Sequence, residues 1–304
     1  MISSASLLLL YIYIYIYIYI YIYICVCENF LSPIFGLTKL KPLLIMEIHN
    51  IIIKCSFTNN NSSDNSTEQD YFSVSAIIER ANKNVDQTLD ESTVLFGDIA
   101  EYTGFQNADP CISRGCKWSK HKKGKVYVPY SISNQYSIRE KQIIQGALYS
   151  FANTTCIRFI PRYRQQDYLH IKSESGCYSF VGRRGGEQVV SLQRFGCVYH
   201  GVVQHELLHA LGFKHEQTRS DRDVHVRILY QNIIHGMEHN FQKFQTNNLG
   251  TPYDYNSIMH YGRYAFSKNT EPTIIPIPNN NVAIGRATEM SRVDFQRVNK
   301  LYCG

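Results

Sequence analysis

The chain has 304 residues, and with 44% hydrophobic and 18% charged residues its composition is that of a globular protein of one large domain or two small ones. The net charge of +6 is unevenly spread, because residues 1–106 carry 5 basic and 11 acidic side chains and residues 107–304 carry 26 and 14. The basic side chains of the second part are scattered, which argues against a nucleic-acid-binding protein. An acidic segment ahead of a basic body indicates a segment that covers the body and is later removed. The alternative interpretation is that two solvated surfaces differ by chance.

The first 27 residues contain a run of leucines and seven Tyr-Ile pairs from Tyr11 to Ile24. Strict alternation with period two favours a strand, whereas the length and apolar character fit a secretion signal or a membrane anchor. A TA-dinucleotide repeat also encodes Tyr-Ile pairs, so a low-complexity tract or a mistaken gene start is a third interpretation. We interpret residues 1–27 as a signal-like, low-complexity leader.

Residues 28–106 follow as a second region. Its stretch 56–70 is rich in asparagine and serine, which predicts a disordered linker. Apolar residues recur at helical spacing over 71–84 and predict an amphipathic helix. Residues 85–106 are expected to be extended, and they include Asp98 directly after a glycine, a pair that by itself usually marks a turn.

The region from 107 to 304 begins with signals for a sheet and a helix. Ser137 and Glu140 have the spacing of a capping box, so a helix is expected to begin there, with an apolar face that ends at Phe151. Alternating or apolar runs predict strands at 126–130, 157–160, 168–171 and 189–192. The Gly-Gly pair before the last of these predicts a turn into an exposed edge strand. Further helices are expected from about Tyr199 and over about 291–302.

The most informative stretch starts at His205. His205 and His209 are four residues apart, so on a helix their rings project from one face and can share a metal ion. Glu206 can address a water molecule on that metal. Gly212 suits the end of the helix because glycine takes a positive φ without steric cost, and His215 can then return as a third ligand. Three neutral imidazoles with one open position are typical of catalytic rather than structural zinc.

Six cysteines follow residue 107: Cys111, Cys116, Cys156, Cys177, Cys197 and Cys303. An even number without Cys-x-x-Cys spacing favours disulfides over a second metal site. Disulfides in turn imply an oxidising, extracytoplasmic compartment. Three further cysteines, Cys25, Cys27 and Cys55, are expected to lie outside this framework.

Residues 205–222 resemble the signature of the astacin family of metzincin zinc metalloendopeptidases. Ser257–Tyr261, preceded by Tyr253-Asp254-Tyr255, resembles the Met-turn of that family. The likeness extends over about residues 71–304 and is strongest to the hatching-enzyme and nephrosin-like, six-cysteine branch of fish. The resemblance implies an α+β fold of the metzincin zincin type. An N-terminal sheet-plus-helix lobe and an irregular C-terminal lobe are expected on either side of the active-site helix.

The resemblance also implies roles for individual residues. His205, His209 and His215 would bind one zinc ion, Tyr261 would be a movable further ligand and a catalytic residue, and Glu206 would be the catalytic base. Met259 would lie beneath the metal as the Met-turn methionine; without the resemblance it is an ordinary core residue. Glu216 would pair with the amine of a new N-terminus; without the resemblance it is a surface carboxylate. The implied disulfides are Cys111–Cys116, Cys156–Cys303 and Cys177–Cys197.

Asp98 gains a role from the same resemblance. Prosegments of the family carry a Phe-x-Gly-Asp motif whose aspartate takes the place of the water on zinc, and here Leu95 replaces the phenylalanine. Asp98 is therefore the expected latency ligand. Residues 28–106 would be the prosegment and 107–304 the catalytic domain. There is no lysine or arginine between residues 84 and 113, so a trypsin-like activator has no site near Asn107.

We thus expect a secreted zinc endopeptidase made as a zymogen, with protein or peptide substrates from the egg envelope or from tissue. Its own prosegment is the expected inhibitor, and neither nucleic acid nor a membrane is an expected partner of the mature form. Asn153-Thr154-Thr155 is a candidate glycosylation site, with a chance match as the alternative. Two other classes remain: a non-enzymatic binding protein on this fold, and an enzyme anchored in a membrane by residues 7–27.

Overall fold

The computed structural model describes residues 68–85, 92–102 and 115–304. We call 68–85 and 92–102 the N-terminal segment and 115–304 the body. The predicted leader, nearly all of the polar stretch, the expected cleavage point before Asn107, and Cys111 with its expected disulfide lie outside the described residues.

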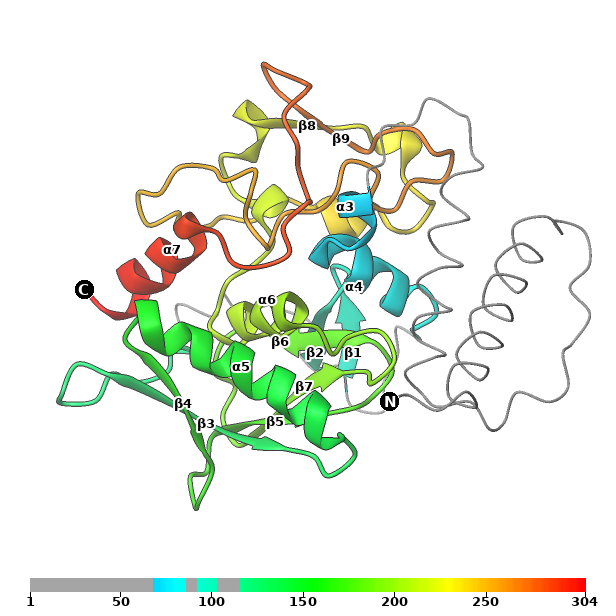
Figure 1. Cartoon of the computed structure of the whole chain (residues 1–304). Coiled ribbons are helices and arrows are strands. Elements are labelled where there is room, and N and C mark those ends of the chain that lie inside the picture. The colour runs from blue at the N-terminus through cyan, green and yellow to red at the C-terminus, as the bar shows by residue number, and fades with distance from the viewer. Residues whose placement is uncertain (1–67, 86–91, 103–114) are drawn as a thin grey trace, which may run out of the picture. The chain divides into compact units, whose positions relative to one another are not determined.

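A seven-stranded mixed sheet forms one side of the molecule, in the order β1-β2-β6-β7-β5-β3-β4 (Figure 1). In the body, β4 is parallel to β3, β3 is parallel to β5, and β5 is parallel to β7, whereas β6 is antiparallel to β7. The antiparallel pair β1–β2 belongs to the N-terminal segment and extends the sheet, with β2 parallel to β6. The strands are β1 (Ser92–Leu95), β2 (Ile99–Tyr102), β3 (Val126–Ile132), β4 (Ile157–Pro161), β5 (Tyr168–Lys172), β6 (Cys177–Phe180) and β7 (Glu187–Leu192).

Two helices of the body pack together beside this sheet. Helix α5 (Ile138–Thr154) begins at the expected capping box, in which the Ser137 hydroxyl accepts from the Glu140 N–H and the Glu140 carboxylate accepts from the Ser137 N–H. Helix α6 (His200–Ala210) contacts α5, β6 and β7. Every residue of α6 after His200 is buried, as expected for a helix enclosed by structure on all sides. The ligand-bearing helix therefore lies at the centre of the fold (Figure 1).

The chain after α6 has little regular structure. It contains short 3₁₀ helices at Glu216–Thr218, Arg222–Val224, Tyr230–Asn232 and Glu238–Phe241, and a two-stranded sheet of β8 (Val226–Ile228) and β9 (Ile274–Pro276). Helix α7 (Arg292–Tyr302) closes this lobe and begins at a second capping box, from Ser291 to Asp294. The expected division into a sheet lobe, a central helix and an irregular lobe is confirmed, and the fold is α+β.

The N-terminal segment also contributes helices α3 (Glu68–Tyr71) and α4 (Val74–Asn82), which account for the helix expected over 71–84. Helix α4 contacts α6. Its first N–H, from Val74, donates to the Ala287 carbonyl at 2.9 Å, and the Ser75 hydroxyl accepts from the Gly262 N–H at 3.0 Å. The N-terminal segment is thus attached to both lobes of the body.

One expectation about the sheet is wrong. The strand predicted at 189–192 is present as part of β7, and the preceding glycines form a turn, but β7 lies between β5 and β6 and is not an edge. The edge strands of the body's part of the sheet are β4 and β6, and all residues of β6 are buried. Its short sequence has no polar-apolar alternation, so the usual strand signal is absent. The short strands β8 and β9 were also not predicted.

Two disulfides connect the elements. They join Cys156 to Cys303 and Cys177 to Cys197, the pairs that the resemblance implies. The first links the start of β4 to the end of α7 across 147 residues of sequence. Within the described residues, no helix is long and apolar enough to cross a membrane.

The disulfide between Cys156 and Cys303 is expected to stabilise the body by restricting the unfolded chain. Replacement of both cysteines by serine should lower the free energy of unfolding by about 2–5 kcal/mol, the range usual for loss of a native disulfide. Denaturant unfolding of parent and double variant measures this, and the double change avoids the free thiol that a single change leaves. Equal stabilities of the two proteins would contradict the prediction.

Candidate metal centre

Three histidines converge at the C-terminal end of α6. His205 and His209 lie one turn apart on the helix, and their ring centroids are 4.8 Å apart. Gly212 adopts a φ of +98° and ends the helix, so the chain turns back and brings in His215. The His215 ring centroid lies 5.4 Å from that of His205 and 4.8 Å from that of His209. The three rings expected from the sequence are therefore brought together.

Backbone carbonyls orient two of these rings. The Nδ1 atom of His205 lies 2.9 Å from the Ile258 carbonyl oxygen, and Nδ1 of His209 lies 2.7 Å from that of Phe213. A proton on Nδ1 satisfies both contacts and leaves each Nε2 lone pair free, which is the usual arrangement around ligating histidines. Burial lowers the pKa of His209 to about 4, so this imidazole is neutral near pH 7, the form that binds metals.

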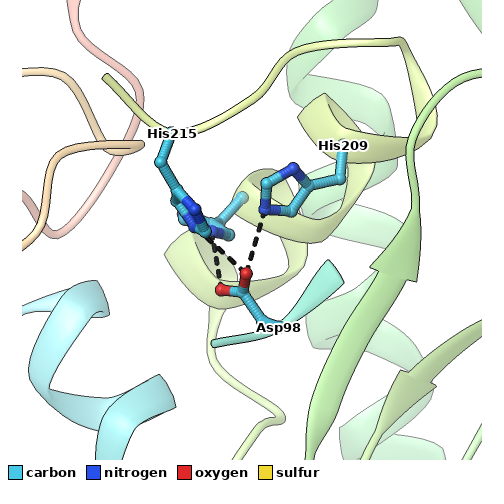
Figure 2. A group of neighbouring side chains, drawn as sticks. Asp98, His209 and His215 are labelled. Carbon is cyan, nitrogen blue, oxygen red and sulfur yellow. Dashed lines mark hydrogen bonds and ion pairs between the residues drawn. The ribbon is translucent and has the colours of Figure 1, made fainter. Parts of the chain in front are cut away.

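The fourth member of the cluster is Asp98, from the turn between β1 and β2 (Figure 2). Its carboxylate lies 3.1 Å from Nε2 of His205, 3.3 Å from that of His209 and 3.0 Å from that of His215. Burial acts to raise the pKa of Asp98, but the three imidazoles together hold it well below its usual value. The aspartate expected from the sequence thus lies directly on the three histidines.

The donor set fits a zinc ion. One candidate atom from each of Asp98, His205, His209 and His215 lies within 4.8 Å of every other. Among the described residues, the buried Nε2 atoms of His209 and His215 and the Oδ1 atom of Asp98 have no hydrogen-bond partner. Buried polar atoms without partners are costly, and a cation among them would remove that cost. Three imidazole nitrogens and one carboxylate oxygen are ligands that zinc accepts.

Glu206 is fully buried beside this cluster. Neither of its carboxylate oxygens has a hydrogen-bond partner among the described residues. Burial, and secondarily the Asp98 carboxylate, raise its pKa well above the usual value. Glu206 is therefore a group that holds a proton readily in this environment.

The Met-turn residues lie close to the same histidines. The Tyr261 ring centroid is 4.6 Å from that of His215, and its hydroxyl donates to the Phe96 carbonyl at 2.6 Å. Met259 is buried, and its carbonyl accepts from the Glu216 N–H at 2.9 Å. This turn is thus bonded both to the segment that follows His215 and to the N-terminal segment.

The Glu216 carboxylate is buried and has several partners. It accepts from Nη1 and Nη2 of Arg297 at 2.5 and 2.7 Å, from Arg219 at 3.3 Å and from the Asp254 N–H at 2.7 Å. Burial raises the pKa of Glu216 and Arg297 opposes this. In the structure its charge is thus paired with arginine, and its pairing with a new N-terminus stays a prediction. Glycosylation at Asn153, which is exposed in the last turn of α5, also stays a prediction.

Sequence reasoning missed Asn82. Its side-chain amide donates to the Gly97 carbonyl at 2.8 Å and to the Cys177 carbonyl at 2.7 Å, and its oxygen accepts from the Cys177 N–H at 2.8 Å. One side chain thus connects α4, the Asp98 turn and the edge strand β6. An asparagine at the end of a predicted helix carries no signal of such long-range contacts.

A buried helix with two histidines and a glutamate, completed by a third histidine after a glycine turn, defines the class of zinc-dependent endopeptidases. The sequence model of the peptidase family described as Astacin matches residues 115–303. The chain belongs to the astacin family and is a zinc metalloendopeptidase.

Two proteins of the fish Oryzias latipes are similar over most of the chain. The chain is 50% identical to Low choriolytic enzyme over 246 residues, 80% of this chain and 89% of that protein. It is 50% identical to High choriolytic enzyme 1 over 234 residues, 77% and 84% respectively. The solved structure of High choriolytic enzyme 1, a hatching enzyme zinc-protease, matches with a TM-score of 0.62 and 54% identity. That match covers 64% of this chain and 98% of the other.

Gly97 permits the close approach between the Asp98 turn and Tyr261. A Cβ atom at this position would lie 2.4 Å from the Tyr261 hydroxyl oxygen, and the φ of +88° is itself unfavourable for other residues. Gly97→Ala should therefore displace the turn and raise amide hydrogen exchange over residues 92–102. Gly124→Ala is the matched control, since its φ is also positive but a Cβ there meets nothing within 4 Å. Unchanged protection of 92–102 in Gly97→Ala would refute the contact.

Proposed function

We propose that the chain is made as a secreted, latent precursor and, after removal of the N-terminal segment, hydrolyses protein substrates by means of His205, His209, His215, Glu206 and Tyr261. The main support is the position of the Asp98 carboxylate. It lies on all three imidazole Nε2 atoms, where a water molecule and a substrate carbonyl would have to bind. A protease site blocked by its own chain is the arrangement of a zymogen.

In the active form the three imidazoles would hold the zinc ion, which would supply a bound water of lowered pKa and a positive charge beside the scissile carbonyl. Glu206 would take a proton from that water and later deliver it to the leaving amine, as general base and then general acid. The Tyr261 hydroxyl, now bonded to Phe96, becomes free to donate to the oxyanion that develops on the substrate.

Strand β6 is the proposed binding edge for the substrate. In the precursor β2 pairs with it through Ile99 and Ala100, which face Ser179 and Phe180 in the register. Removal of the N-terminal segment would expose these backbone groups, and an extended substrate can pair with such an edge by β-augmentation. The strand at 189–192, which the sequence predicted as an exposed edge, lies inside the sheet and offers no free edge to a substrate.

The N-terminal segment is the proposed inhibitor, with Asp98 as its latency ligand. Leu95, which replaces the phenylalanine of the family motif, packs in an apolar cluster with Phe96, Ile99, Val181 and Phe244. The leucine thus keeps the apolar contact of the segment with the body. We propose residues 28–106 as the prosegment and 107–304 as the catalytic domain, stabilised by Cys111–Cys116 in addition to the two disulfides already described.

The similarity to two choriolytic enzymes and a hatching enzyme zinc-protease supports a hatching-type role. We propose egg-envelope proteins as substrates, with tissue proteins as the alternative. A non-enzymatic function is disfavoured because the three histidines lie in one cluster and Glu206 is present on the same helix.

The role of Glu206 is tested by Glu206→Ala in the matured enzyme. Zinc content should be unchanged, since the three imidazoles remain, whereas peptidase activity should fall by about 10²–10⁴-fold, as is usual for loss of a general base. Metal analysis and hydrolysis of a quenched fluorescent peptide measure the two quantities. Glu271→Ala, at an exposed position, serves as control. Full activity of the Glu206 variant would contradict the proposed mechanism.

Latency is tested in the uncleaved precursor. Asp98→Ala should raise basal peptidase activity, because the carboxylate on the histidines is removed. Asp70→Ala is the control within the same segment, since that carboxylate pairs with Arg286 and not with the histidines. If the Asp98 variant is as inactive as the parent, Asp98 is not the latency ligand.

A further inference from the structure

We propose that Lys214 and Phe244 form a subsite for an aromatic substrate side chain, which Phe96 fills in the precursor. The inference rests on the proposed function, because it requires the N-terminal segment to leave and a substrate to take its place. It adds a preference for an aromatic substrate side chain, and it identifies Lys214 as the residue that determines this preference.

The Phe96 side chain occupies a well-defined place against the body. It is 8% exposed, and its ring lies edge-on to that of Phe244, with centroids 5.1 Å apart and planes at 75°. A second edge contact, at 6.0 Å, is made with the His239 ring. The apolar cluster around it contains Leu95 and Ile99 from its own segment and Val181 and Phe244 from the body. Removal of the segment would therefore uncover Val181 and Phe244 together.

Lys214 gives this place a positive charge. Its Nζ atom lies 3.5 Å from the centroid of the Phe244 ring and 5.5 Å from that of Phe96. Both distances are within the range in which an ammonium group is attracted to the face of a ring. Burial lowers the pKa of Lys214; the Glu101 carboxylate opposes this shift and Arg184 adds to it. Phe96 and Glu101 would leave with the N-terminal segment, and Lys214 would remain on Phe244.

The place lies close to the reacting centre. The backbone carbonyl of Phe96 accepts from the Tyr261 hydroxyl at 2.6 Å, and Asp98, two residues further on, contacts the three histidines. Lys214 itself immediately precedes His215 in the sequence. A substrate chain that crosses the metal centre would therefore pass a side chain through the region of Lys214.

An aromatic side chain suits these walls better than an acidic or aliphatic one. A ring can lie edge-on to Phe244 and present its face to the ammonium, as the ring of Phe96 does. An aliphatic side chain would bury the same apolar area but lose the attraction to the charge. An acidic side chain could pair with Lys214, but its carboxylate would lose hydration next to the apolar side chains of Val181 and Phe244.

The test compares peptides cleaved by the full-length chain after its maturation by limited proteolysis. Each of the three positions on either side of the scissile bond carries phenylalanine, cyclohexylalanine, leucine or glutamate in turn. At one position kcat/KM for phenylalanine should exceed that for cyclohexylalanine by about 2- to 5-fold, because the two differ mainly in the π face. Lys214→Met should bring this ratio to about one, since methionine fills similar space without charge.

Two controls separate the subsite from general effects. Lys243→Met removes a neighbouring positive charge that pairs with Asp223 at 2.5 Å, and it should retain the preference for phenylalanine. Lys214→Arg should also retain it. Thermal unfolding and zinc content show whether each variant is folded. If Lys214→Met is not folded, Lys214→Arg is the variant on which the inference is tested.

The outcomes distinguish the two proposals. If the matured chain cleaves no peptide in the presence of zinc, the proposed function fails. If it cleaves peptides but prefers glutamate, or does not separate phenylalanine from cyclohexylalanine, the subsite inference is overturned and the function stands. A phenylalanine preference that persists in Lys214→Met, or that is lost in a folded Lys214→Arg, also overturns it.

Discussion

The contact on which the rest of the structure depends is the one between the Asp98 carboxylate and three buried imidazoles. An aspartate with 1% exposure is unfavourable unless positive or hydrogen-bonding groups surround it. The buried Nε2 atoms of His209 and His215 also have no hydrogen-bond partner among the described residues. A cation held between the carboxylate and the imidazoles would satisfy both sides of the contact. The position of the N-terminal segment on the body follows from this local chemistry.

The histidines are held from several parts of the chain. Two come from α6 and are oriented by the carbonyls of Ile258 and Phe213. The third is followed by Glu216, whose carboxylate binds Arg297 on α7, and α7 is joined to β4 by a disulfide. A ligand on an irregular segment therefore gains rigidity from a buried ion pair and a covalent link, and the lobe needs little regular structure of its own.

The sequence predicted the parts of the fold with strong local signals. The capping box at Ser137, the strands with alternating or continuous apolar residues and the histidine spacing on α6 depend on neighbours in the sequence, and these expectations agree with the structure. Strand β6 is short and fully buried, so its sequence lacks a distinguishing period, and the edge was wrongly assigned to β7. The contacts of Asn82 and Lys214 join positions far apart in the chain. Their side chains are common surface types, so nothing in the local sequence marks them.

The bonds of Asn82 have a consequence for how the N-terminal segment acts. Its amide presents a donor and an acceptor to the backbone of Cys177, as a neighbouring strand would, and also holds Gly97 next to the aspartate turn. Helix α4 and the Asp98 turn are thereby connected to each other and to β6 through one side chain. If the chain is activated as proposed, a cut between α4 and the turn alone would leave each of them in contact with the body. Release of the metal centre would then require both parts to dissociate, so the contacts of α4 would slow activation together with the contact of Asp98.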